Sequence, residues 1–193
     1  MERKEEKGGK KEDSMDVFML IDVSGSMAGN RLENAKTALR QISDTMEEND
    51  RLAILTFDSN AFYKLKPRPV GQIRRQQELD PLLARIFAQG STALYDAIFL
   101  CFDSIRDKNN RRTKIVVLTD GMDNASRHSL AEVNALLDGF PNVSLDIVHI
   151  ADSAELNPSY AELADRGRGE YQVIVETEIV VSMVTVVRKV YLR

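Results

Sequence analysis

Short apolar runs alternate along the chain with longer stretches in which apolar residues recur at helical spacing. Apolar runs of five to eight residues are typical of strands that are covered on both faces. We predict five such strands, at residues 16–22, 51–57, 115–119, 143–150 and 171–175. Residues 61–66 alternate in polarity and predict a sixth, edge strand that ends before Pro67.

The stretches between the strands predict helices, because their apolar residues would line one face. Asp80 before Pro81 is a capping pattern and predicts a helix over Leu82–Ala88. Ser129 and Glu132 form the pattern of a capping box. Further helices are predicted from the first strand's loop to Met46, from Ser91 to Ile105, from Asn157 to Ala164, and over Glu178–Tyr191.

Strands that alternate with helices predict an α/β fold. We expect a doubly wound, mainly parallel six-stranded sheet with one antiparallel edge strand and helices on both faces. The chain has 193 residues, of which 43% are hydrophobic and 29% charged, and this fits one domain. The first 14 residues mix Lys, Glu and Gly without an apolar run, so we expect a flexible tail over 1–14 and the domain over 15–193.

The charge and the cysteine content narrow the possible settings. A net charge of −4 gives no reason to expect nucleic acid as a partner. No apolar run is long enough to cross a bilayer, so membrane insertion is not expected. The single cysteine, Cys101, excludes an internal disulfide. Together these features predict a cytoplasmic protein, or an extracellular one if a signal sequence lies outside this chain.

Oxygen-bearing side chains gather where three predicted elements meet their loops. Asp22, Ser24 and Ser26 follow the first strand, Thr92 lies at the start of a helix, and Asp120 follows the strand at 115–119. In open α/β sheets such loops converge at the carboxyl ends of the strands. Carboxylates and hydroxyls suit a hard divalent cation such as Mg²⁺, with Mn²⁺ or Ca²⁺ as alternatives. Because the protein oxygens do not fill six positions, such an ion would seek an outside carboxylate.

At these residues the chain resembles the von Willebrand factor A-type domain family. That family carries a metal-ion-dependent adhesion site built from an Asp-x-Ser-x-Ser loop, a Thr and an Asp, and the sequence matches all five positions in order. The resemblance covers about residues 16–192 and implies a Rossmann-like fold. It implies that Ser24, Ser26 and Thr92 are direct ligands, and that Asp22 and Asp120 act directly or through water.

The leading interpretation is therefore a protein-binding module and not an enzyme. Its Mg²⁺ would capture a Glu or Asp side chain of a partner protein, and the chain would be monomeric or part of a larger protein or complex. Two alternatives stay open. One is a metal-dependent phosphohydrolase in which Asp22 or a metal-bound water attacks phosphate; the other is a scaffold whose metal site is silent.

Four residues near these loops have less certain roles. Asp96 either orients the Thr92 loop or faces solvent as an ordinary helix acid. Asp123 and Asn124 are interpreted as an Asx-type turn. His128 precedes a capping serine and is expected to be exposed, without a ligand role.

Overall fold

The computed structural model describes residues 14–105, 111–153 and 156–175. The predicted tail, apart from Ser14, and the helix predicted over Glu178–Tyr191 lie outside this part of the chain. The strands are β1 (Asp16–Asp22), β2 (Arg51–Phe57), β3 (Ala61–Pro69), β4 (Thr113–Thr119), β5 (Val143–Ala151) and β6 (Tyr171–Val175). The helices are the short 3₁₀ helix η1 (Gly25–Met27), α1 (Asn30–Thr45), α2 (Val70–Gln76), α3 (Leu79–Leu83), α4 (Leu94–Ile105), α5 (Leu130–Asp138) and α6 (Pro158–Arg166).

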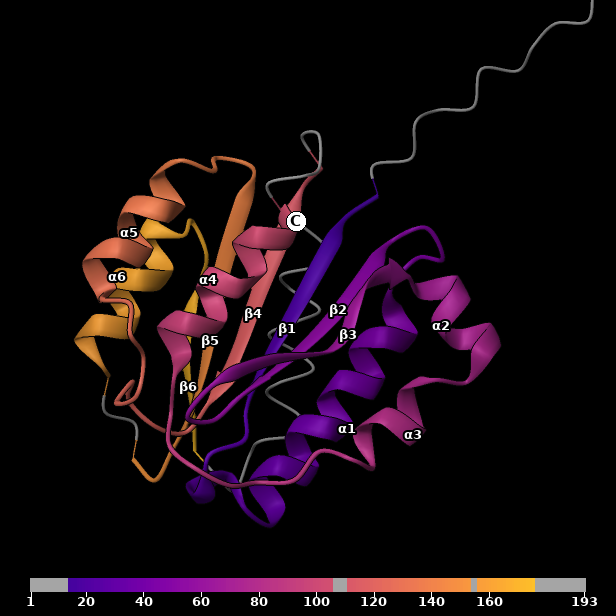
Figure 1. Cartoon of the computed structure of the whole chain (residues 1–193), viewed down its shortest axis with the longest axis horizontal. Coiled ribbons are helices and arrows are strands. Elements are labelled where there is room, and N and C mark those ends of the chain that lie inside the picture. Colours follow the sequence, from indigo (N-terminus) through magenta and orange to yellow (C-terminus); the bar gives the residue numbers. More distant parts are fainter. Residues whose placement is uncertain (1–13, 106–110, 154–155, 176–193) are drawn as a thin grey trace, which may run out of the picture.

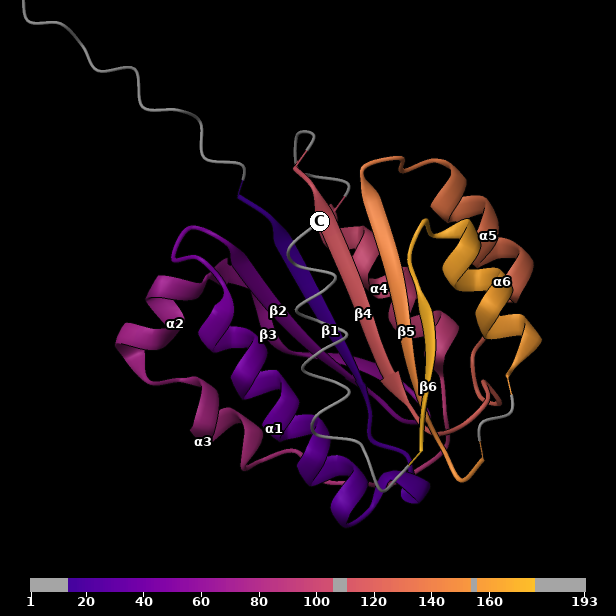
Figure 2. The same ribbon diagram turned by 180° about the vertical axis from the view of Figure 1, so that it is seen from behind.

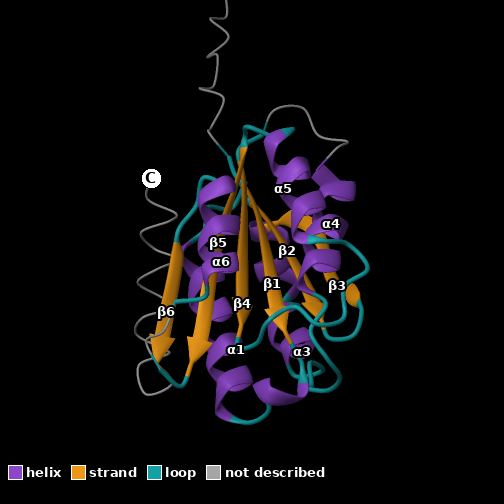
Figure 3. Cartoon of the chain, turned by 90° about the vertical axis from the view of Figure 1, so that its left-hand side faces the viewer, coloured by secondary structure: helices purple, strands orange, loops and turns teal. Residues whose placement is uncertain are grey.

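The six strands form one sheet in the order β3-β2-β1-β4-β5-β6. All neighbouring strands are parallel except β2 and β3, which are antiparallel. The predicted doubly wound sheet with one antiparallel edge strand is therefore confirmed. The chain winds outward from β1 in one direction to β2 and in the other to β4, so the strand order reverses between β1 and β4. Figure 3 shows that the parallel strands have their carboxyl ends on the same side of the sheet. Ligands of such sheets bind on this side, at the switch point.

Helices cover both faces of the sheet (Figures 1 and 2). Met19 and Ile21 of β1 pack in the core that α1, α2 and α3 close, whereas Phe18 and Leu20 pack in the core on the side of α4, α5 and α6. Every residue of β1 is buried. Burial on both faces explains why this strand is an uninterrupted apolar run, and it fixes the position of its last residue, Asp22.

Three predicted boundaries were wrong, and one of them is the helix predicted from Ser91, which begins at Leu94. The edge strand β3 does not end before Pro67 but continues to Pro69, with a register shift against β2; prolines are tolerated there because one side of an edge strand makes no ladder bonds. The helix predicted over Leu82–Ala88 instead spans Leu79–Leu83. Beyond it the amides of Arg85 and Ile86 bind the carbonyl oxygens of Leu82 and Leu83, and the amide of Gln89 then binds the carbonyl oxygen of Val23 at 2.6 Å.

No helix within residues 14–105, 111–153 and 156–175 is long and apolar enough to cross a membrane.

Candidate functional site

Asp22 lies at the carboxyl end of β1 with a fully buried side chain. Its Oδ1 accepts a hydrogen bond from the Ser24 amide at 2.8 Å, and its Oδ2 accepts one from the Thr119 hydroxyl at 2.5 Å. Burial raises the pKa of Asp22, and the nearby carboxylate of Asp120 adds to the increase, while the hydrogen bonds from Thr119 and Ser24 oppose it. The carboxylate is thus held rigidly in a place where a positive charge would be favourable.

Ser24, Ser26 and Asp120 are joined by their side chains. The two serine hydroxyl oxygens lie 3.1 Å apart, and the Ser26 hydroxyl donates to Asp120 Oδ1 at 2.8 Å. Ser24 is buried, Ser26 is exposed, and the Asp120 side chain has no exposed surface. The amide of Gly25 binds the carbonyl oxygen of Gly90 at 3.1 Å, which ties this loop to the one that carries Thr92.

Thr92 lies two residues before α4 and is held by the loop that follows Asp120. Its amide donates to Asn124 Oδ1 at 2.9 Å, and its carbonyl oxygen accepts from the Asn124 amide at 2.9 Å. A methyl group added to Gly121 would lie 3.5 Å from Thr92 Oγ1, so the threonine hydroxyl is next to the backbone that follows Asp120. Thr92 itself is 3% exposed. The five predicted residues therefore lie on three loops that contact one another.

Arg31, in the first turn of α1, extends into this group of loops. Its Nη1 lies 2.7 Å from Asp120 Oδ2, and its Nη2 lies 2.5 Å from Asp152 Oδ1, in the segment after β5. The two oxygens of Asp120 thus have different partners, the Ser26 hydroxyl and the Arg31 guanidinium.

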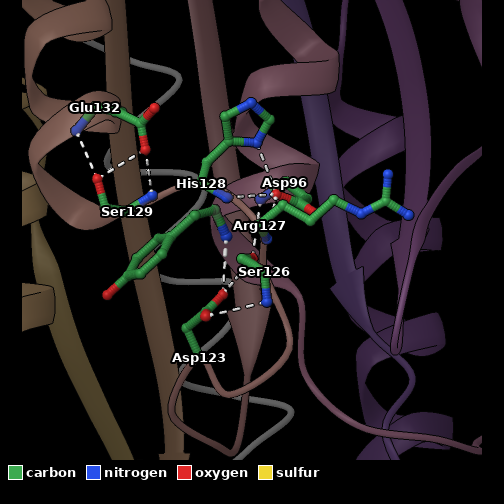
Figure 4. Close-up of polar contacts among 8 residues, drawn as sticks. Asp96, Asp123, Ser126, Arg127, His128, Ser129 and Glu132 are labelled. Atoms are coloured by element: carbon green, nitrogen blue, oxygen red, sulfur yellow. Dashed lines mark hydrogen bonds and ion pairs between the residues drawn. The ribbon is translucent and has the colours of Figure 1, made fainter.

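The loop after Asp120 is fastened to the start of α4 by two carboxylates (Figure 4). Asp123 Oδ2 accepts from the Tyr95 amide at 3.1 Å and from the Ser126 hydroxyl at 2.5 Å. Asp96 Oδ1 accepts from the amides of Arg127 and His128, at 3.1 Å each. Asp96 therefore positions the loop that runs on from Asp120.

His128 was expected to be exposed, and its side chain is 38% exposed but has contacts on one side. Its Nδ1 lies 2.7 Å from Asp96 Oδ1, and its ring stacks on Phe99 at a centroid distance of 3.7 Å. Burial alone would raise the pKa of Asp96, but the hydrogen bonds from His128 and Arg127 outweigh it and lower this pKa. His128 therefore belongs to the same set of contacts that joins this loop to the start of α4.

Sequence reasoning missed several residues that support the site. Thr119 and Arg31 were overlooked, and Asp123 and Asn124 were interpreted only as a local turn. Thr119 directly precedes Asp120, so its place at the strand end was available as a signal. Arg31 gave no signal, because its partners Asp120 and Asp152 lie about a hundred residues further along the chain.

The donor chemistry of the site fits a hard divalent cation. Two buried carboxylates and three hydroxyls are all oxygen donors of the kind that Mg²⁺, Mn²⁺ and Ca²⁺ prefer. Within the described part of the chain, no three His, Cys, Asp or Glu side chains are grouped so that they could hold a metal. A cation at these loops would therefore depend on the hydroxyls of Ser24, Ser26 and Thr92, as well as on the carboxylates.

Comparison of the sequence with known proteins gives a consistent result. A profile of the von Willebrand factor type A domain matches residues 17–123, which is more than half of the chain. An uncharacterized protein of Synechocystis is 32% identical over 108 residues, and the match covers 55% of this chain and 25% of that protein. The rat voltage-dependent calcium channel subunit alpha-2/delta-3 is 31% identical over 117 residues, which cover 55% of this chain and 11% of the subunit. The chain thus matches a quarter or less of these relatives' length.

Solved structures share the fold. A von Willebrand factor type A protein from Catenulispora acidiphila superposes with a TM-score of 0.78 at 18% identity, covering 91% of this chain and 42% of that one. Proximal thread matrix protein 1 from the mussel byssus, solved with a zinc-occupied MIDAS motif, superposes with a TM-score of 0.73 at 17% identity, covering 92% and 46%. At such low identity these likenesses show the fold alone.

Proposed function

Because the chain belongs to the von Willebrand factor type A domain family, we propose that it is a protein-binding module that works through a divalent cation. The residues that would hold the cation are Asp22, Ser24, Ser26, Thr92 and Asp120. We propose Mg²⁺ as the ion, with Mn²⁺ and Ca²⁺ to be tested beside it. The bound partner would be a protein that offers a Glu or Asp carboxylate.

The observation that carries the proposal is the convergence of the three loops at the switch point of the sheet. Asp22 and Asp120 have no exposed side-chain surface, and the hydroxyls of Ser24 and Ser26 lie 3.1 Å apart beside them. The guanidinium of Arg31 offsets part of the negative charge of these two buried carboxylates, and a bound cation would offset the rest. Bonds to Thr119, Asn124 and the backbone fix these loops before any cation arrives, so little ordering would be needed on binding.

The surroundings of the site suit a partner surface. When bound, a hard cation would offer its open coordination position to an outside anionic oxygen. Ser26 is exposed at the edge of the site, so a partner can reach it. Met122, two residues after Asp120, exposes 64% of its surface and would give a partner an apolar contact beside the carboxylate.

The direct test is calorimetric titration of the chain with MgCl₂, compared between wild type and the Asp120→Ala variant. Loss of this carboxylate should raise the dissociation constant for Mg²⁺ by roughly 10-fold to 100-fold or more, because the loss of a residue that only hydrogen-bonds a metal ligand already has an effect of about this size. Asp138→Ala is the matched control, because Asp138 is half-exposed on α5 and pairs with Arg166. Its affinity should equal that of wild type.

The alternatives give different results in the same preparation. A scaffold with a silent site would fold normally and give no heat with Mg²⁺, Mn²⁺ or Ca²⁺. A phosphohydrolase would release phosphate from a generic phosphate ester in the presence of Mg²⁺, and Asp22→Ala would abolish the release. Either result would contradict the proposed function.

A further inference from the structure

The guanidinium of Arg31 brings a positive charge to the candidate site. Its guanidinium lies 2.7 Å from Asp120 Oδ2 and 2.5 Å from Asp152 Oδ1. Its side chain is 17% exposed, that of Asp120 is 0% exposed and that of Asp152 is 85% exposed. Arg31 therefore joins the innermost carboxylate of the site to one at the surface.

A guanidinium in this position repels a metal ion. It stays protonated at every physiological pH, so its charge cannot be removed to make room for another cation. Asp120 is close to buried Asp22, and together they carry the charge that a divalent ion would need. If a divalent ion approaches Asp120, it meets the charge of Arg31 at the same carboxylate.

We propose that Arg31 competes with the divalent cation for Asp120 and thereby lowers the affinity of the site for metal. This inference rests on the proposed function, because it assumes that Asp120 serves a bound cation. The ion pair between Arg31 and Asp152 allows Arg31 to give up its contact with Asp120. As Asp120 turns its charge to the metal, Arg31 keeps Asp152 as a partner and is not left as a buried, unpaired charge.

The test uses variants that separate charge from structure. Arg31→Gln removes the competing charge and keeps a hydrogen-bond donor, while Arg31→Lys keeps the charge. Arg40→Gln is the matched control on the same helix, because Arg40 pairs with Asp80 at 2.6 Å on the surface. Each variant of the full chain is titrated with MgCl₂ and separately with MnCl₂ by calorimetry.

We expect Arg31→Gln to lower the dissociation constant for Mg²⁺ by on the order of tenfold. This figure corresponds to the repulsion of a monovalent and a divalent cation roughly 5 Å apart at the dielectric constant of water. Arg31→Lys should stay close to wild type, and Arg40→Gln should not change the affinity.

Thermal unfolding supplies a readout that a merely structural role would not move. In EDTA, Arg31→Gln should unfold at a lower temperature than wild type, because buried Asp120 has lost its counter-charge. Saturating Mg²⁺ should then raise the unfolding temperature of the variant more than that of wild type, since tighter binding stabilises the folded state more. A residue that only supports the fold would lower both temperatures equally.

The outcomes distinguish the two proposals. Unchanged or weaker Mg²⁺ binding in Arg31→Gln, with normal binding in wild type, would overturn the competition and leave the metal site standing. Absence of binding in wild type and in Arg31→Gln alike, with both proteins folded in EDTA, would overturn the proposed function and the competition with it.

Discussion

The hydroxyl of Thr119 is a side-chain donor to the buried Asp22 carboxylate, and its removal tests how the site is preorganised. Thr119 has no exposed surface, and its Oγ1 lies 2.5 Å from Asp22 Oδ2. The same oxygen lies 3.0 Å from the Gly121 carbonyl oxygen and accepts from the Gly121 amide at 3.3 Å. Valine has nearly the same shape as threonine, so Thr119→Val removes these interactions while the packing is retained.

The expected cost follows from the charge of the acceptor. A hydrogen bond to a charged group contributes roughly 1.5–3 kcal/mol, and the carboxylate that loses it stays buried. The extra methyl group that valine buries recovers at most about 0.8 kcal/mol. We therefore expect Thr119→Val to lower the free energy of unfolding by roughly 1–2 kcal/mol at neutral pH.

Urea denaturation in EDTA, followed by circular dichroism, measures this difference without any metal. Thr113→Val is the matched control, since Thr113 is also buried on β4 but its hydroxyl donates to the neutral carbonyl oxygen of Arg111 at 3.3 Å. Its cost should be about 1 kcal/mol or less. If Thr119→Val were no more destabilising than Thr113→Val, Thr119 would not be holding an ionised Asp22.

Two further predictions concern stability and do not depend on a bound metal. A methyl group on Gly169 would lie 2.0 Å from the Leu145 carbonyl oxygen, so Gly169→Ala should cost several kcal/mol or prevent folding. Gly139→Ala is the control and should cost far less, because its methyl group would lie 3.4 Å from the nearest atom. Equal urea midpoints of the two variants would contradict this prediction. Burial lowers the pKa of His149 below its usual value of about 6.5, so protonation favours the unfolded chain, and the stabilisation is complete above that pH and is lost as the pH falls below it. His149→Gln, which keeps a polar partner for the Tyr171 hydroxyl, should reduce the loss of stability between pH 7.5 and 5.5, and an unchanged slope would refute the assignment.

The strands of the sheet were accessible from the sequence because strands buried on both faces are apolar runs, whereas their order in the sheet is seen only in the structure. β1 and β4 lie in the centre and are covered on both faces, so their sequences are continuous apolar runs. The capping box of Ser129 and Glu132 is local and was also predicted correctly. These features depend on neighbours in the sequence or on burial alone.

The misplaced helix shows where local patterns fail. Asp80 and Pro81 looked like a helix start, but Asp80 lies inside α3 and binds Arg40 of α1. After the helix, Gln89 pairs with the backbone of Val23. These contacts join distant segments of the chain, and no local pattern encodes them.

The candidate site also has a part that the sequence predicted and a part that only the structure shows. The five oxygen-bearing residues could be proposed from the sequence because they lie in loops after predicted strands or at the start of a predicted helix, and because they match the family's metal-site pattern in order. The supporting contacts of Arg31 with Asp120 and of Asn124 with Thr92 join loops that are 32 or more residues apart, so only the folded structure shows them.

The central claim is that the three loops hold one divalent cation. Crystals of the chain grown with MnCl₂, with diffraction data collected at the manganese absorption edge, would locate the ion by its anomalous signal. We predict a single strong peak within coordination distance of the hydroxyls of Ser24, Ser26 and Thr92, next to Asp22 and Asp120. Well-ordered loops without a peak between them, or a peak bound elsewhere, would contradict the proposed function.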